Sequence, residues 1–100
     1  MPAVASYFIL FRGGANQNMR AQIALSDAAG ITVAYMRFYD LGQLTANDSV
    51  DAAGVITMNL PFVAFQSVLD VLRNEQPINV YFAGLGFFGT ATLEPVGEGE

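Results

Sequence analysis

The chain has no histidine, no cysteine, no lysine and no tryptophan among its 100 residues. These absences remove the side chains that most often serve as general base, thiol nucleophile, Schiff-base amine or soft metal ligand. Carboxylates, tyrosines, hydroxyls and four arginines remain, and they form no Walker motif, nucleophile elbow or zinc spacing. We therefore expect a protein that is not an enzyme and that holds no cofactor and no metal.

Charged residues are also few. They make up 13% of the chain, against about 25% in an average domain, and the net charge is −5. So few cations leave no basic surface of the kind that duplex nucleic acid requires, and we expect no duplex partner. By contrast, 53% of the residues are hydrophobic, and contiguous exposed apolar area usually marks an interface. This balance favours self-association; the alternative is a monomer whose neutral surface consists of uncharged polar residues.

Long hydrophobic runs are missing as well, since polar residues or glycines interrupt each one short of the roughly 18 residues of a membrane span. Residues 1–5 carry no basic side chain, and the apolar run that follows stops at Arg12, so we expect no signal peptide and a cytoplasmic protein. The length predicts one domain, over residues 1–93, that buries about two thirds of its surface. Residues 94–100 combine glycine with glutamate and should form a flexible tail.

Strand patterns dominate the domain. Residues 4–12 are apolar at both sets of alternating positions, which is typical of a strand that is covered on both sides. Residues 19–27 alternate cleanly between apolar and polar positions, which indicates one wet face. Further strands are expected at 31–40, in a short hairpin at 47–59, and at 78–83 and 87–93.

Two of the connections share one turn sequence. The tetrapeptide Asp-Ala-Ala-Gly occurs at residues 27–30 and again at 51–54. Aspartate at the start of a type I turn and glycine at a position of positive φ predict a three-residue hairpin loop with a bulge. Residues 84–89 match the pattern G-x-G-x-x-G, but a phosphate loop needs a helix after it, and a strand is expected there. The glycines at 84 and 86 instead predict a tight hairpin turn.

One helix is expected, over residues 60–74. Asn59 is a candidate N-cap, and Pro61 suits the first turn. The apolar stripe of this helix consists of Phe62, Phe65, Val68, Leu69 and Leu72. The predicted fold is therefore α+β, a predominantly antiparallel curved sheet that one helix covers on one face.

The register between residues 19–27 and 31–40 decides what two of the four arginines do. With a three-residue loop, Arg20 faces Phe38 and forms a surface ion pair with Asp40. With a four-residue loop, Arg20 faces Arg37, and two opposed arginines beside tyrosines would hold a phosphate or a carboxylate. The turn sequence favours the first register, and the second remains the alternative.

Oxygen ligands gather between the third strand and the short hairpin, at Asp40, Asn47, Asp48 and Asp51. Their spacing matches no EF-hand loop, so an ordinary loop or turn is the preferred interpretation over a calcium site. The same aspartates would be the best candidates if the protein were an enzyme.

Most aromatic residues lie on predicted strands, where they could fill the core, form a subunit interface, or stack the bases of a single strand. Because no basic groove is evident in the sequence, we favour core and interface roles. We predict a small, non-enzymatic module that forms a homo-oligomer through Tyr7, Phe11, Phe87 and Phe88.

The alternative function is a small-ligand or anion-binding domain. Arg37 would bind the ligand together with Tyr35 and Tyr39, because residues at alternate positions of one strand share a face. Arg20 would join them if the hairpin register is shifted.

Overall fold

The computed structural model describes residues 3–13, 19–40, 47–75 and 77–89. One sheet has five strands in the order β2 (Ser6–Phe11), β3 (Met19–Ser26), β4 (Thr32–Tyr39), β6 (Ile56–Pro61) and β5 (Ser49–Val50). A second sheet has three strands in the order β1 (Ala3–Val4), β7 (Ile78–Phe82) and β8 (Gly86–Gly89). A short 3₁₀ turn, η1 (Phe62–Ala64), leads into the helix α1 (Phe65–Asn74).

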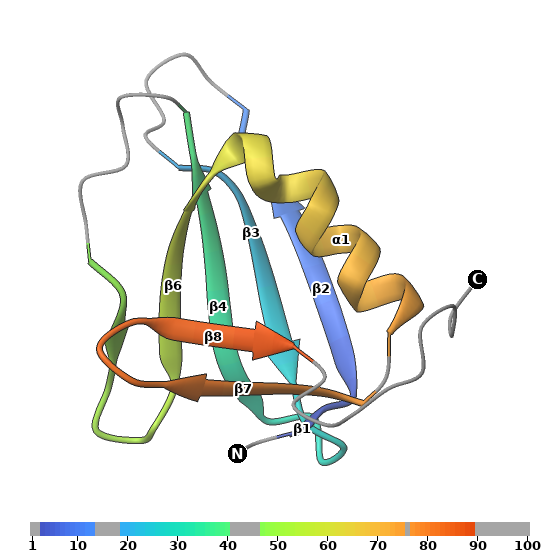
Figure 1. Ribbon diagram of the computed structural model, residues 1–100, viewed down its shortest axis with the longest axis vertical. Coiled ribbons are helices and arrows are strands. Elements are labelled where there is room, and N and C mark those ends of the chain that lie inside the picture. The colour runs from blue at the N-terminus through green and yellow to red at the C-terminus, as the bar shows by residue number, and fades with distance from the viewer. Residues whose placement is uncertain (1–2, 14–18, 41–46, 76, 90–100) are drawn as a thin grey trace.

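The helix and the smaller sheet cover the same face of the five-stranded sheet. Figure 1 shows α1 packed across one half of that face, while β7 and β8 run across the strands at the other half. The α+β class, the mostly antiparallel pairing and the single helix agree with the sequence-based prediction. The prediction did not anticipate that the strands divide between two sheets.

One neighbouring pair of strands is parallel. β4 and β6 pair in parallel from Ala34–Ile56 to Tyr39–Pro61, and β5 then pairs antiparallel with the outer side of β6. A parallel connection needs about a dozen residues or more, and residues 40–55 provide that length. The sequence-based prediction of a predominantly antiparallel sheet did not include this parallel pair, which forms because the short hairpin inserts its second strand, not its first, next to β4.

Both predicted three-residue turns are confirmed. The Asp27 Oδ1 atom accepts hydrogen bonds from the backbone N–H groups of Ala29 and Ile31, at 2.9 and 3.0 Å. Asp51 Oδ1 accepts the equivalent two bonds in the second turn, and the glycines that end the loops, Gly30 and Gly54, have φ of 82° and 86°. One local sequence thus builds the same turn twice.

The register of the β3–β4 hairpin follows neither of the two expected patterns along its whole length. Next to the turn, Ser26 lies opposite Thr32, as a three-residue loop requires. The register then shifts, so that Val33 is an extra residue in β4 and Gln22 lies opposite Arg37. Such a bulge increases the local twist of the strands. Arg20 therefore lies opposite neither Phe38, as the preferred register predicted, nor Arg37, as the alternative register did.

The helix begins later than predicted. Asn59 belongs to β6, and the backbone stays extended through Pro61, whose φ and ψ are −70° and 144°. Proline disfavours helical geometry in the residue before it, so Leu60 continues the strand. Asn59 is not the N-cap; its side-chain amide donates instead to the carbonyl oxygen of Asn47. Phe65 and Val68 of the predicted apolar stripe are buried.

The core lies between the five-stranded sheet and its two covering layers. β3 and β4 direct alternate side chains inward, and the sheet-facing residues of α1 and β7 meet them there. The buried apolar residues are Ala21, Ile23, Leu25, Ala34, Met36, Phe38, Ile56, Met58, Phe65, Val68, Ile78 and Val80. The opposite face of the five-stranded sheet has no covering layer among the described residues.

The two sheets approach each other closely at Gly86. A Cβ atom on this residue would overlap the Met58 side chain and lie 3.2 Å from Ile56 Cγ2. We therefore expect Gly86→Ala to lower the free energy of unfolding by about 1–3 kcal/mol, the usual cost of overpacking a core. Denaturant unfolding monitored by circular dichroism measures this loss.

Gly89, in the same strand, is the matched control, because a Cβ atom there would meet nothing within 4 Å. Gly89→Ala should change the free energy of unfolding by less than about 0.5 kcal/mol. Equal losses in the two variants would contradict the close approach at Gly86.

Candidate functional site

The most apolar strand of the protein lies at the edge of the larger sheet. The expectation that residues 4–12 are covered on both sides is wrong, because β2 pairs only with β3 and most of its side chains are exposed. The exposed fractions are 38% for Tyr7, 64% for Phe8, 44% for Leu10 and 61% for Phe11. The sequence pattern was correct in showing two apolar faces, but it carried no information about strand order.

This edge has none of the features with which proteins usually block further strand pairing. β2 contains no charged residue and no proline, and its ladder with β3 runs without a bulge from Ser6–Ser26 to Phe11–Ala21. Charges, prolines, bulges and short length are the common protections of edge strands. The other edge strands, β1, β5 and β8, are protected by their lengths of 2, 2 and 4 residues.

The hydrogen-bonding groups of β2 that pair with no described strand belong to its odd-numbered residues. The Arg12 N–H donates to the Arg20 carbonyl oxygen at 2.8 Å, which extends the β2–β3 ladder by one pair. Hydrogen-bonded and non-hydrogen-bonded pairs alternate along an antiparallel ladder. Tyr7, Ile9 and Phe11 therefore direct their N–H and C=O groups away from β3. We call this row of groups, with the side chains of Ser6–Phe11, the β2 edge.

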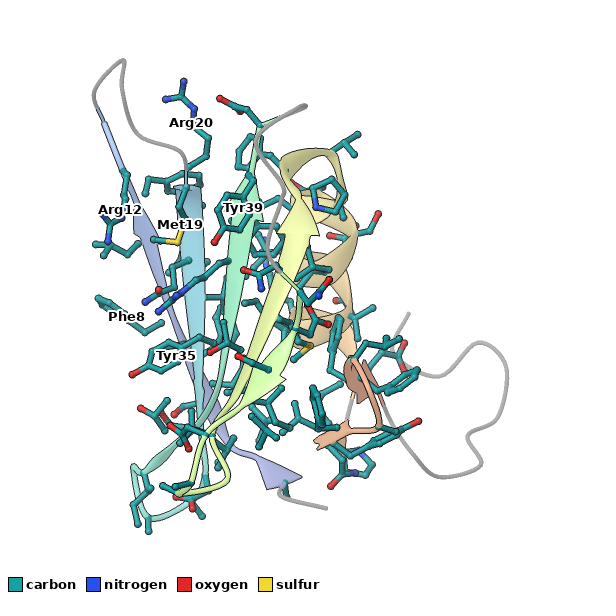
Figure 2. The ribbon with its side chains drawn as sticks, turned by 90° about the vertical axis from the view of Figure 1, so that its left-hand side faces the viewer. Phe8, Arg12, Met19, Arg20, Tyr35 and Tyr39 are labelled. Carbon is teal, nitrogen blue, oxygen red and sulfur yellow. The ribbon has the colours of Figure 1, made fainter. Side chains whose placement is uncertain are left out.

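A second surface is the side of the five-stranded sheet that faces away from α1. Figure 2 shows Phe8, Arg12, Met19, Arg20, Tyr35 and Tyr39 on that side or at its rim. The strand pairing arranges it in rows: Phe8, Ala24 and Tyr35 form one, and Leu10, Gln22 and Arg37 form the next. We call this surface the open face.

Arg37 lies near the middle of the open face. Its Nε atom donates to Gln22 Oε1 at 3.2 Å, and its guanidinium carbon lies 5.8 Å from the centre of the Tyr35 ring, within the range of a cation–π contact. No described carboxylate forms an ion pair with it. The predicted grouping of Arg37 with Tyr35 and Tyr39 on one strand face agrees with this geometry.

Arg20 occupies a different position from Arg37. It is the extra residue where the β3–β4 register shifts for a second time, and its Nε atom pairs with Asp40 Oδ2 at 2.6 Å. This is the surface ion pair that the sequence predicted, and such pairs usually contribute about 0–1 kcal/mol. Arg20 is thus neutralised at the rim of the open face.

The four residues predicted to form an interface lie in two places. Tyr7 and Phe11 are on the β2 edge, where the Phe11 ring also packs against Phe65 with 5.2 Å between ring centres. Phe87 is on the smaller sheet and stacks on Tyr81 at 4.7 Å, while its neighbour Phe88 packs against the core. Of these four residues, only Tyr7 and Phe11 belong to a long edge strand, whose outer side pairs with no described strand.

The aspartates considered as calcium ligands have structural partners. Asp48 Oδ1 accepts the Asn59 N–H at 2.7 Å and Oδ2 accepts the Gly86 N–H at 2.8 Å. One carboxylate therefore ties β6 of the larger sheet to β8 of the smaller one. Asp51 closes its turn and Asp40 pairs with Arg20. No group of three potential metal-ligating side chains occurs among the described residues.

A cleft of about 510 Å³ opens between the start of the chain and the end of α1. Its walls are mixed: Val4, Leu72 and Ile78 are apolar, and Ser6, Tyr7 and Glu75 bring polar groups. Sequence analysis missed this cleft because its two sides are far apart along the chain and carry no local motif.

Comparison with protein-family models, with curated proteins and with solved structures finds no match to this chain. Among the described residues, no helix is long and apolar enough to cross a membrane.

We expect Asp48→Ala to destabilise the protein, because it removes the acceptor of two backbone hydrogen bonds between the sheets. Hydrogen bonds to a charged group are worth about 1.5–3 kcal/mol, and the free energy of unfolding should fall by at least that amount. Thermal and denaturant unfolding measure the loss. Asp70→Ala is the control, since the exposed Asp70 side chain accepts only from Gln66 on the helix surface. A comparable loss in Asp70→Ala would contradict the role of Asp48.

Proposed function

We propose that this protein is a self-associating interaction module in which two copies pair through the β2 edge. The observation that carries the proposal is an edge strand of six residues, apolar on both faces and without protection against pairing. The proposal includes the sequence-based expectations that the protein is cytoplasmic and has no catalytic activity.

A two-fold axis beside Ile9 would allow two β2 strands to pair antiparallel. Tyr7 would then lie opposite Phe11 of the second copy, and Phe8 opposite Leu10 of the second copy, so that the pairs nearest the axis are apolar. Both Tyr7 and Phe11 direct backbone groups to the edge, and each closely spaced pair exchanges two hydrogen bonds. A symmetric pairing of this kind closes on itself as a dimer.

The side chains of this edge supply the driving force. Burial of apolar surface contributes about 25 cal/mol per Å², and large aromatic side chains dominate interface energetics. Tyr7, Phe8, Leu10 and Phe11 are each more than a third exposed. Pairing would bring them into lateral contact with the side chains of the second copy and would satisfy the backbone groups of the edge at the same time.

Leu10→Lys tests the proposal, because a charge on an edge strand opposes pairing with a second copy. Leu10 is 44% exposed, so we expect the variant to keep its fold. Sedimentation equilibrium should show a dimer for the wild type and a dissociation constant raised about tenfold or more in the variant, which corresponds to about 1.4 kcal/mol.

Leu85→Lys is the matched control: it introduces the same charge at a leucine that is 51% exposed, in the turn of the smaller sheet. It should dimerise as the wild type does. A wild-type protein that stays monomeric at the highest soluble concentration would overturn the proposal, and so would equal dissociation of the two variants.

A further inference from the structure

The arginines of this acidic protein are concentrated on one side. Arg37 lies in the middle of the open face, Arg12 continues the outward-facing positions of β2, and Arg20 stands at the rim. Only Arg73 lies elsewhere, in the last turn of α1. The sequence, with its net charge of −5, did not reveal this separation, because residues 12, 20 and 37 meet only through strand pairing.

The described carboxylates lie mostly away from the open face. Asp40 is paired with Arg20. Asp27 and Asp51 close the turns at the ends of their hairpins, and Asp70 and Glu75 belong to α1 and its C-terminus, on the covered side. Among the described residues, the open face therefore carries more arginine charge than unpaired carboxylate charge.

The open face also carries two aromatic residues on either side of a small one. Phe8 and Tyr35 stand in one row, and the residue between them on β3 is Ala24. Two strand spacings separate the rings by roughly 9.5 Å, about twice the distance between the centres of two stacked rings. A flat ring bound in this row would lie above the small Ala24 side chain and stack against one of the two neighbours.

An anion-binding group lies one row away from this slot. Arg37 is two residues from Tyr35 along β4, a distance of roughly 7 Å. Gln22 and the Tyr35 ring hold its guanidinium in place, and no described carboxylate neutralises it. A guanidinium of this kind is a strong ligand for phosphate oxygens.

We propose that the open face binds single-stranded nucleic acid, with bases stacked on Phe8, Tyr35 and Tyr39 and phosphates held by Arg37 and Arg12. Sheets that combine exposed aromatic rings with cationic side chains bind single strands in this way. A duplex is excluded as the partner because its bases are stacked inside the helix and cannot reach the rings. The site shares Phe8 with the β2 edge, but Tyr35, Arg37 and Tyr39 lie on β4, two strands away from that edge, so the site does not require dimer formation.

The overall negative charge does not prevent this binding. Interactions between exposed charges are largely screened beyond about 8 Å at physiological ionic strength. The acidic residues of α1 and its C-terminus belong to the layer on the covered side of the sheet. A strand on the open face is thus exposed mainly to the nearby arginines.

Fluorescence anisotropy with a labelled oligothymidylate of about 12 nucleotides tests the proposal, a length within the usual range for one binding fold. Wild-type protein should bind it, and more weakly as salt increases. Tyr35→Ala should weaken binding about 5- to 150-fold, the range for loss of one stacked base. Arg37→Ala should also weaken binding and should reduce the slope of log K against log salt by about 0.7, the value for one phosphate contact with a single strand.

Two control variants match these substitutions. Arg73→Ala removes the arginine outside the open face, and Tyr81→Ala removes an exposed tyrosine of the smaller sheet. Both should bind within about twofold of the wild type. Circular dichroism and sedimentation on the same samples check that fold and oligomeric state are unchanged, which separates this test from that of the β2 edge.

Several results would overturn the proposal. They are the absence of wild-type binding at low salt, equal weakening by Arg73→Ala and Arg37→Ala, and equal affinity for a duplex of the same length. Equal affinity for an abasic strand would also overturn it, since the bases would then contribute nothing.

Discussion

The apolar inner face of the five-stranded sheet is the constraint on which the rest of the structure depends. β3 and β4 bury Ala21, Ile23 and Leu25 and, opposite them, Ala34, Met36 and Phe38. A face of this kind is stable only when another layer excludes water from it. One helix and one small sheet are the described layers that do so, and both lie on the same side.

Covering one face has two consequences for the surface. The outer face must be compatible with water, and Gln22, Arg37 and the tyrosines of β4 make it so while leaving rings accessible. The outermost strand, β2, lies where the covering layers bury little of it. Its apolar side chains therefore stay accessible on both faces. The open face and the β2 edge both result from the fact that the described covering layers, α1 and the smaller sheet, lie on one face of the larger sheet.

The two sheets are held together by a few specific contacts. Gly86 allows β8 to approach Met58 and Ile56, and Asp48 accepts backbone hydrogen bonds from both sheets. Asp48 thus has a structural role, the connection of the two sheets, which the residues next to it in the sequence did not indicate. Its partners, Asn59 and Gly86, are far from it in the sequence, and no local spacing connects the three.

Short-range patterns were the reliable part of the sequence-based prediction. The two Asp-Ala-Ala-Gly turns form as expected because one aspartate and one glycine satisfy the loop within five residues. The alternation of β3 and the apolar stripe of α1 were also predicted correctly. Errors appeared where a neighbour in space overrides the local preference, as at Asn59, which continues β6 beside β4 instead of capping the helix.

The candidate surfaces could be predicted only in part. The shared face of Tyr35, Arg37 and Tyr39 follows from the period of two along a strand. The row that places Phe8 and Tyr35 on either side of Ala24 depends on strand order and on the bulge at Val33. A register shift of one residue exchanges the faces of a strand, and the sequence left that register open.

The sequence by itself determined most of the residues that form strands, turns and the helix, because hydrogen bonds and periodicity within a few residues decide them, but it did not determine where β6 ends and the helix begins. It also determined that the chain has few charged residues, four arginines among them and no lysine. Only the tertiary structure decided that the most apolar strand is an edge and that Arg12, Arg20 and Arg37 gather on one side. The physical reason is that strand order and register depend on contacts between residues that are far apart in the sequence. These residues compete for places in a single core.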